Sequence, residues 1–481
     1  MTLPIGFTVR INRRTRLLEA GRVLVGGSPT TVLALTGLAR AVLTDRVIRI
    51  TGEPSARLAR LLLDRGMADP VVEALPDLDV DVTVVIPIRD RPVQLDRLLA
   101  SVPGGLRVIV VDDGSRRPEL VAAVARRHGA ELLPLPVNVG PAGARNAGLA
   151  RVATQFVAFV DSDIVLDPDA IRILLRHFAD PGVGLAVPRV AAYRRGGSEG
   201  WIARYEAGRS SLDLGTEPAS IRPRSTVSWA SSACVVARVA AIGSGFDDTM
   251  RVGEDVDLVW RLVDAGWRAR YEPAATAYHD HRIAFWPWLR RKFFYGTSAE
   301  PLAQRHSEHI APAVLAPWGI GLAVVLLAQR WWSIPAALGI AASTANRIAR
   351  KLPIEHPRRW GAVLAARGVA NTLGQFSALL LRHWWPVTAI AAIRSRRIRR
   401  AVLVAAVADA VVEYAKSDRS LDPLRFGVAR RLDDLAYGAG VWWSAIRRKS
   451  FAALRPALSP ATEARRGGVS DAADPQHRGP N

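Results

Sequence analysis

Residues 138–163 read NVGPAGARNAGLARVATQFVAFVDSD, and this stretch decides the fold. It predicts a helix and then an apolar strand, QFVAFV, that ends on Asp161 and Asp163. The strand carries no charge and alternates too little to be half exposed, so we expect a central strand of an α/β sheet covered on both faces. Two carboxylates one residue apart at a strand end can both turn toward one hard cation, such as Mg²⁺ or Mn²⁺. Alone, the pair would equally fit a turn or a helix cap.

Two further apolar strands upstream also end in acidic residues. They are DVTVVIPIRD, with Pro87 and Asp90 at its end, and RVIVVDDGS, with Asp112 and Asp113. Helical stretches, PVQLDRLLASV and ELVAAVARRHG, follow these two strands. This alternation predicts parallel pairing with right-handed crossovers. The strand ends should therefore bring the aspartates to one edge of one sheet, where ligands bind in such folds.

Four motifs in this region occur in a familiar order, namely VVIPIRDR, VVDDGS, NVGPAGARNAGL and FVDSD. They resemble the family 2 glycosyltransferases of the GT-A fold over about residues 80–300. The resemblance implies a UDP-sugar donor site with a Mg²⁺ or Mn²⁺ ion. Its donor-binding residues would be Pro87, Asp90, Asp112, Asp113, Arg145, Asn146 and Asp161, and its metal ligands Asp161 and Asp163. The alternatives are an ion pair for Arg145 and a helix-surface amide for Asn146.

A base for the acceptor hydroxyl is expected near the segment GFDDTMRVGEDVDLVWRLVDAGWRARYEP. Glu254 and Asp255 open a predicted helix there, and in the resembled family such a pair lies at the acceptor end of the site. We assign Asp255 as the general base and Glu254 as its orienting or acceptor-binding partner. The alternative is acidic charge favoured by the helix dipole, worth about 0.3 to 1 kcal/mol. Asp257 fits that alternative better.

A short strand is expected next, followed by AYHDHR, in which His279 and His281 are two residues apart. On an extended segment both would point to one side, where an imidazole could complete the metal shell. The resemblance favours His279 as the ligand, and a solvated histidine is the alternative. The QxxRW motif of processive membrane synthases does not occur here, which argues against synthesis of a long polysaccharide.

Cysteine usage excludes several other kinds of site. The single cysteine, Cys234, lies in an apolar stretch and is expected in the core rather than as a reactive thiol. One cysteine cannot form an internal disulfide, and with only scattered histidines we expect no structural zinc site. The N-terminal MTLPIGFTVRINRRTR has no apolar core of the kind that a secretory signal needs.

Charge is concentrated in the C-terminal part of the 481-residue chain. From Arg282 onward there are 30 basic and 12 acidic residues, a net of +18 out of +21. The same part contains an uncharged run at 309–329, which narrowly reaches the length of about 20 residues that a spanning helix needs. Arginine clusters and paired tryptophans suit an anionic membrane surface, so we expect re-entrant or interfacial helices over 306–455. A soluble helical domain is the alternative. No nucleic-acid motif is present, and the tail at 456–481 is expected to be disordered.

Residues 1–78 are expected to form a separate, small winged-helix-like domain, ahead of a catalytic domain at 79–305. Two short strands meeting at Ala20 and Gly21 should be followed by a helix over 30–45, a strand over 46–51 and a second helix. This unit resembles the PqqD-like domains that bind leader peptides, and such domains can take a peptide as an added strand. A plain structural extension is the alternative.

The three parts together resemble the glycosyltransferases of mycofactocin systems. This resemblance implies an inverting transfer of glucose from UDP-glucose to a peptide-derived redox cofactor precursor, which builds a short β-linked chain at the cytoplasmic face of the membrane. The rival reading is a cell-envelope glycosyltransferase with a lipid-linked or polysaccharide acceptor.

Overall fold

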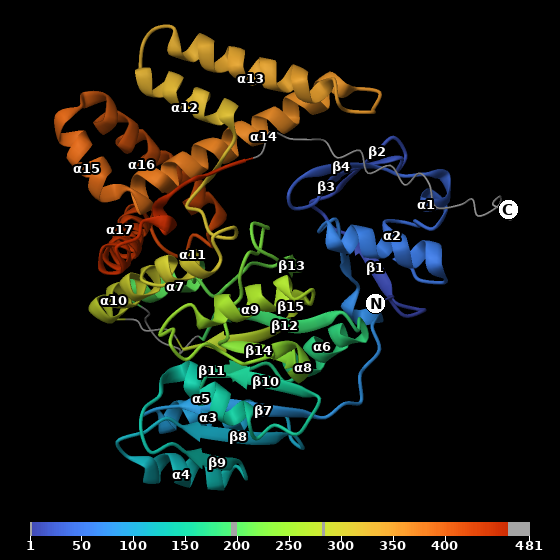
Figure 1. Cartoon of the computed structure of the whole chain (residues 1–481), viewed down its shortest axis with the longest axis vertical. Coiled ribbons are helices and arrows are strands. Elements are labelled where there is room, and N and C mark those ends of the chain that lie inside the picture. Colours follow the sequence, from blue (N-terminus) through green and yellow to red (C-terminus); the bar gives the residue numbers. More distant parts are fainter. Residues whose placement is uncertain (1, 194–199, 281–283, 460–481) are drawn as a thin grey trace, which may run out of the picture.

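A nine-stranded sheet forms the centre of the computed structural model, which describes residues 2–193, 200–280 and 284–459 (Figure 1). Its strand order is β11-β15-β12-β14-β10-β7-β8-β9, and β13 pairs with β15. The strands are β7 (Val82–Ile88), β8 (Arg107–Asp112), β9 (Glu131–Pro134), β10 (Phe156–Val160), β11 (Ile164–Leu166), β12 (Val183–Ala192), β13 (Ala219–Ile221), β14 (Cys234–Arg238) and β15 (Arg268–His279).

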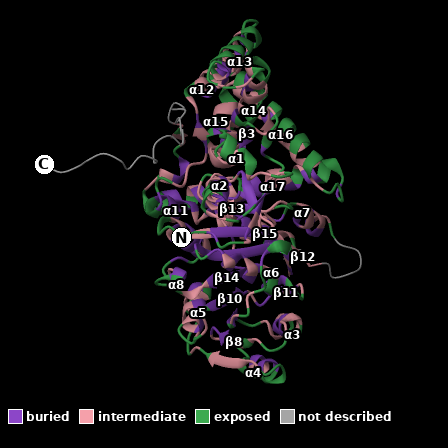
Figure 2. Cartoon of the chain, turned by 90° about the vertical axis from the view of Figure 1, so that its right-hand side faces the viewer, coloured by how far each residue is buried: buried purple, intermediate pink, exposed green. Residues whose placement is uncertain are grey.

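The half of the sheet formed by β10, β7, β8 and β9 is parallel, as the sequence predicted for its three apolar strands. Its helices are α3 (Pro92–Ser101), α4 (Pro118–Arg127) and α5 (Gly140–Leu149). All seven residues of β7 are buried, with Val84 and Ile86 in one core and Val85 in the other. Burying one such side chain stabilises the fold by about 1.5 to 3 kcal/mol. The absence of alternation in β7 and in the equally buried β10 therefore reflects two covered faces. Figure 2 shows buried strands between the helices.

The other half of the sheet is mixed, because β14 runs antiparallel to both β10 and β12. Cys234 is buried at the start of β14, as predicted. The strand expected before AYHDHR is longer than predicted: β15 spans 12 residues and includes His279, because it pairs with β11, β12 and β13. The helices of this half are α6 (Ala170–Arg176), α7 (Trp201–Arg209), α8 (Val239–Ile242) and α9 (Glu254–Asp264).

The N-terminal part folds into two three-stranded sheets, β5-β1-β6 and β2-β3-β4, with a core of its own. Its elements are β1 (Thr8–Ile11), β2 (Arg16–Leu18), β3 (Val23–Gly26), β4 (Thr31–Ala34), α1 (Gly37–Ala41), β5 (Val47–Arg49), α2 (Glu53–Asp64) and β6 (Ala68–Pro70). The helix predicted over 30–45 is wrong in its first half, because β-branched Thr31 and Val32 pair with β3 as a strand. Arg60 links this part to the domain of the central sheet through two hydrogen bonds to Asp180, of 2.8 and 2.9 Å.

The C-terminal part is helical. Its elements are α10 (Phe285–Gly296), α11 (Ala299–Arg305), β16 (Val314–Leu315), α12 (Pro317–Ala328), α13 (Ser333–Ala349), α14 (Pro357–Ala378), α15 (Trp385–Arg394), α16 (Arg396–Lys416), α17 (Pro423–Arg448) and β17 (Ala457–Leu458). Strand β17 pairs with β16, so the first residues of the tail predicted to be disordered are ordered, and 460–481 lie outside the described residues.

The apolar run at 309–329 does not form one spanning helix. Its only helix is α12, whose 12 residues reach about 18 Å, short of the roughly 30 Å hydrocarbon core of a bilayer. Among the described residues, no single helix has both the length and the apolar composition to cross a membrane. One bent pair, Pro357–His383 with Trp385–Arg394, meets the length and composition test together, with a bend of 92°.

Candidate active site

The acidic residues predicted to meet do follow the carboxyl ends of parallel strands. Asp112 is the last residue of β8, Asp90 follows β7 by two residues, and Asp161 and Asp163 follow β10. Pro87 is buried within β7, beyond Val85, where the pairing of that strand with β10 stops. A proline therefore costs no hydrogen bond to β10 at this position.

Three of these aspartates shape the loops around the strand ends. Asp113 accepts hydrogen bonds from the backbone N–H groups of Val139 (2.7 Å) and Gly140 (3.0 Å) at the start of α5. Asp112 accepts one from Ser115 N–H (3.1 Å), and Asp90 accepts one from Arg116 N–H (2.7 Å). Burial raises the pKa of Asp113 in spite of its two backbone donors. Contact of these residues with a sugar donor stays a prediction.

Asp163 and His279 lie side by side, as a shared ligand role requires. His279 Nε2 is 3.5 Å from Asp163 Oδ1, and Arg91 forms a short ion pair with Asp163 Oδ2. Burial alone would raise the pKa of Asp163, but His279 and Arg91 hold it well below its usual range. A spacing of roughly 3 to 3.5 Å is what two ligands bound at about 2.2 Å to one ion would have, so the pair fits a divalent cation. The other candidate ligand, His281, lies outside the described residues.

Arg145 links the two acidic groups of the site. Its guanidinium, 3% exposed, donates to Asp161 Oδ1 at 2.6 Å and to Glu254 Oε1 at 3.1 Å. Burial would lower the pKa of Arg145, but the two carboxylates raise it, so the side chain stays charged. The ion pair that the sequence left open for Arg145 therefore exists, and it joins the end of β10 to the beginning of α9.

Asn146 has a structural contact that sequence reasoning missed. Its side-chain amide donates to Phe246 C=O (2.7 Å) and accepts from Phe246 N–H (2.8 Å), so both polar ends are engaged by one backbone. It is therefore not a free helix-surface amide, and its contact with a nucleotide stays a prediction. By holding the loop before α9, it supports the site indirectly.

Helix α9 begins at Glu254, and its first turn holds the acidic pair. Gly253, at φ 84°, precedes the helix, and Leu258, Trp260 and Leu262 are buried as predicted. The hydrogen bonds that Asp255 accepts from the described residues come from backbone N–H groups, those of Val256 (2.8 Å) and Ser232 (3.4 Å). Burial and the neighbouring Glu254 carboxylate raise the pKa of Asp255 to about 7.

Two arginines near the site were not assigned from the sequence. Arg91 lies next to Asp90 in the motif VVIPIRDR, and its place directly after a strand end was the signal that could have identified it. Arg291, on α10, donates a hydrogen bond to Tyr295 Oη at 2.9 Å. Burial would lower the pKa of Arg291, but Tyr295 and, to a lesser extent, the charges of Asp163 and Asp161 raise it. Nothing in the local sequence pattern of α10 indicates that Arg291 lies near these aspartates.

Comparison with known proteins decides the family. Residues 83–238 match the family model "Glycosyl transferase family 2". Pre-mycofactocin glycosyltransferases from two strains of Mycobacterium tuberculosis are each 44% identical to this chain over 467 residues, covering 95% of it and 98% of the relative. The chain belongs to the pre-mycofactocin glycosyltransferase family. It is a glycosyltransferase, and its central sheet is the catalytic domain of the GT-A fold.

More distant relatives of this glycosyltransferase match over a shorter stretch. An N-acetylglucosaminyltransferase of Mesorhizobium japonicum is 31% identical over 248 residues, which are 48% of this chain and 57% of that protein. The structure of a mannosyltransferase from Pyrobaculum calidifontis in complex with GDP-Man and Mn²⁺ superposes with a TM-score of 0.41 at 16% identity. That superposition covers 76% of this chain and 90% of the other.

Proposed function

We propose that this glycosyltransferase moves glucose from UDP-glucose to the mycofactocin precursor, with inversion at the anomeric carbon and with the help of a divalent cation. The family membership supports the acceptor class. The observation that carries the proposal is the ion-pair chain Asp161–Arg145–Glu254, because it brings the proposed donor and acceptor carboxylates to one side chain.

On the donor side, Asp163 and His279 would hold Mn²⁺ or Mg²⁺, with Asp161 close by. Such an ion, when bound, neutralises charge on the leaving diphosphate. Arg91 and Arg291 add fixed positive charge to the same edge of the sheet, which suits a diphosphate ligand.

On the acceptor side, Asp255 acts as the general base. It takes the proton of the acceptor hydroxyl as that oxygen bonds to the anomeric carbon and the bond from that carbon to UDP breaks. Attack opposite to the leaving group gives a β-linked product from an α-linked donor. A pKa of about 7 suits this role, because a base is most effective when its pKa is near the working pH. Glu254, neutralised by Arg145, orients the acceptor.

The peptide-derived nature of the acceptor gives the N-terminal part a role. We assign residues 1–78 a PqqD-like, peptide-binding function, in which a peptide strand extends one of its two small sheets. Both sheets have only three strands and therefore offer backbone edges for such pairing. A short β-linked oligoglucose chain would result from repeated transfer to the same precursor.

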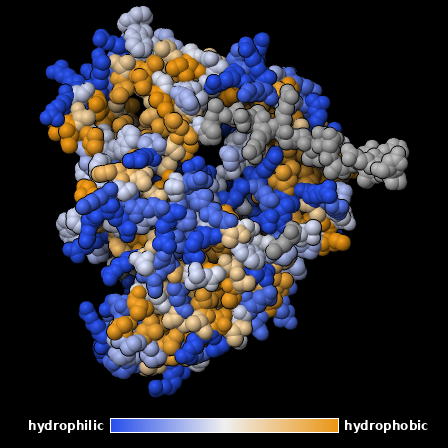
Figure 3. Space-filling model, in the orientation of Figure 1, coloured by the Kyte–Doolittle hydropathy of each residue, from blue (hydrophilic) through white to orange (hydrophobic). Residues whose placement is uncertain are grey.

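We further propose attachment to the cytoplasmic face of the cell membrane through the C-terminal part. Large apolar side chains are exposed there, over α12, α13 and α15 among others (Figure 3). They include Val324, Trp331, Ile334, Leu338, Val387, Ile390, Ile393, Leu403 and Val404. Exposed arginines, among them Arg396 and Arg400, open α16, where the helix dipole disfavours positive charge. An anionic lipid surface would offset that cost.

The function is tested with purified full-length chain, UDP-glucose, Mn²⁺ and the mycofactocin precursor, followed by mass spectrometry. We expect the precursor to gain one or more hexoses, and the gain to be lost in Asp163→Ala. If UDP-glucose binds but no hexose reaches the precursor, and transfer requires a lipid-linked acceptor instead, the cell-envelope reading replaces this one.

A further inference from the structure

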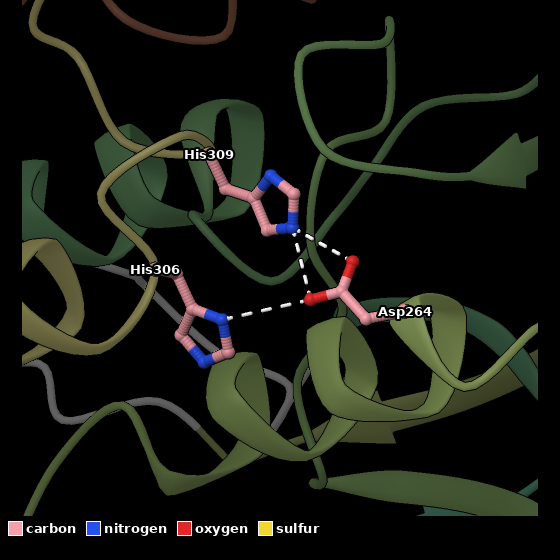
Figure 4. Close-up of side chains that lie close together, drawn as sticks. All are labelled: Asp264, His306 and His309. Carbon is pink, nitrogen blue, oxygen red and sulfur yellow. Dashed lines mark hydrogen bonds and ion pairs between the residues drawn. The ribbon is translucent and has the colours of Figure 1, made fainter.

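A second group of possible metal ligands lies away from the active-site aspartates, at the other end of α9. Asp264, the last residue of α9, faces His306 and His309 in the segment that follows α11 (Figure 4). One ligand atom from each of the three residues lies within 4.8 Å of the other two. Asp264 is 45 residues from His309 in sequence, and this separation explains why the sequence pattern predicted no zinc site.

The hydrogen bonds of His306 fix which of its ring nitrogens is free. Its Nε2 lies 2.9 Å from Asp257 Oδ1, and a carboxylate only accepts, so Nε2 carries the proton. Asp257 is fully buried and is already neutralised by Arg261 (2.8 Å) and Arg305 (3.2 Å). In the neutral ring the lone pair of Nδ1 then points toward Asp264 Oδ2, 3.9 Å away. A cation placed between these two acceptors would satisfy both.

His309 completes the group. Its Nε2 lies 2.8 Å from Asp264 Oδ1 and 3.0 Å from Oδ2, and its ring stacks with that of His306 at 14°. Within the described part of the chain, no arginine or lysine forms an ion pair with Asp264. The ligands of a tetrahedral zinc ion lie roughly 3.4 Å apart, given bonds of about 2.1 Å, and the distances of 2.8 to 3.9 Å bracket that value.

We propose that Asp264, His306 and His309 bind one structural divalent cation, with zinc the best match. Two imidazoles and a carboxylate are a common set of zinc ligands. Zinc-bound histidines usually donate their other ring N–H to a carboxylate, as His306 does to Asp257. The ion fastens the C-terminal end of α9 to the segment at 306–309. Helix α9 carries Glu254 and Asp255 at its other end, so the ion stabilises the helix that holds the catalytic base.

The test measures bound metal in the full-length chain after dialysis against a weak chelator. We expect about one zinc per chain, since the three residues form one site, and visible absorption of tetrahedral Co²⁺ after replacement. Both signals should disappear in His309→Ala and in Asp264→Asn. They should persist in Asp163→Ala, which removes the catalytic metal ligand, and in His128→Ala. His128 is the matched control, because it pairs with Asp96 at 2.8 Å without a second histidine.

A zinc content that is unchanged in His309→Ala and Asp264→Asn would overturn the proposal, and so would a parent chain that retains no metal. Circular dichroism of each variant shows whether it is folded. Thermal unfolding gives a second readout: zinc should raise the midpoint of the parent and of His128→Ala but leave that of His309→Ala unmoved.

Discussion

Consecutive carboxylates at the beginning of α9 have different environments, and this difference fits the separate roles that we propose for them. Glu254 forms an ion pair with Arg145, whereas the donors to Asp255 among the described residues are backbone N–H groups, and the pKa of Asp255 is raised to about 7. The sequence identified both residues from their place in a motif. It could not show which one is paired, because Arg145 is 109 residues away along the chain.

We expect Asp255→Asn to lower kcat by about 10²- to 10⁴-fold while the affinity for UDP-glucose stays near that of the parent, because only the proton acceptor is lost. The same change should raise the thermal unfolding midpoint above neutral pH, since it removes a charge that burial disfavours. Transfer assays and calorimetry measure both effects. Asp248→Asn, at an exposed site in the preceding loop, is the control, and normal transfer by Asp255→Asn would refute the assignment.

The pH dependence follows from the same raised pKa. Folded Asp255 keeps its proton up to about pH 7, and the protonated form cannot accept another, so kcat/KM should fall as the pH drops below about 7. Between the ordinary pKa of 3.8 and about 7, the folded state binds the proton more tightly than the unfolded state does, so this group's contribution to stability declines as the pH rises through that window. A profile of kcat/KM that is flat through neutrality would contradict this.

At the scale of elements, the parallel strands and their helices were predictable because their apolar patterns are local. The β4 strand and the length of β15 were not, because both depend on pairing with strands elsewhere. Packing of α10 against α17 is another non-local feature. Gly296 and Gly440 allow close contact there, and buried Lys292 pairs with Glu206 (2.8 Å) and Asp433 (3.3 Å).

Gly296→Ala should destabilise the protein by about 1 to 3 kcal/mol, because the added Cβ would overlap the carbonyl oxygen of Tyr437 on α17. Gly374→Ala is the matched control. It also lies in a helix, but its Cβ would meet no atom within 4 Å, so it should stabilise by about 0.5 to 1 kcal/mol. Urea unfolding of both variants provides the comparison, and equal shifts in the two would rule out the packing argument.

At the scale of the whole molecule, charge and exposed apolar surface coincide in the C-terminal part, and the sequence indicated this asymmetry correctly. The arrangement of the short apolar helices could not be predicted from the sequence, because contacts between these helices determine where each one begins and ends. The longest uncharged run yields only α12, and the place of the 92° bend between α14 and α15 was not predicted within the re-entrant or interfacial helices expected there.

Binding to vesicles that contain anionic lipid should weaken by roughly 30-fold or more in Arg396→Glu/Arg400→Glu, since each basic residue near the surface adds about 1 kcal/mol. Cosedimentation at low and high salt measures this. Arg126→Glu/Arg127→Glu on α4 changes the same charge far from the apolar helices and should bind as the parent does. Equal losses in both variants would mean that net charge, and not this surface, governs binding.

Arg145 has a consequence for the kinetic order of the reaction. The guanidinium of Arg145 pairs with Asp161 on the proposed donor side and with Glu254 on the proposed acceptor side. A cation that binds near Asp161 together with the sugar nucleotide would weaken the pairing of Arg145 with Asp161 and strengthen its pairing with Glu254. The charge around Glu254 would therefore reach its final arrangement only after the donor has bound. On the proposed roles, we therefore expect an ordered reaction in which the sugar nucleotide binds first and the precursor second.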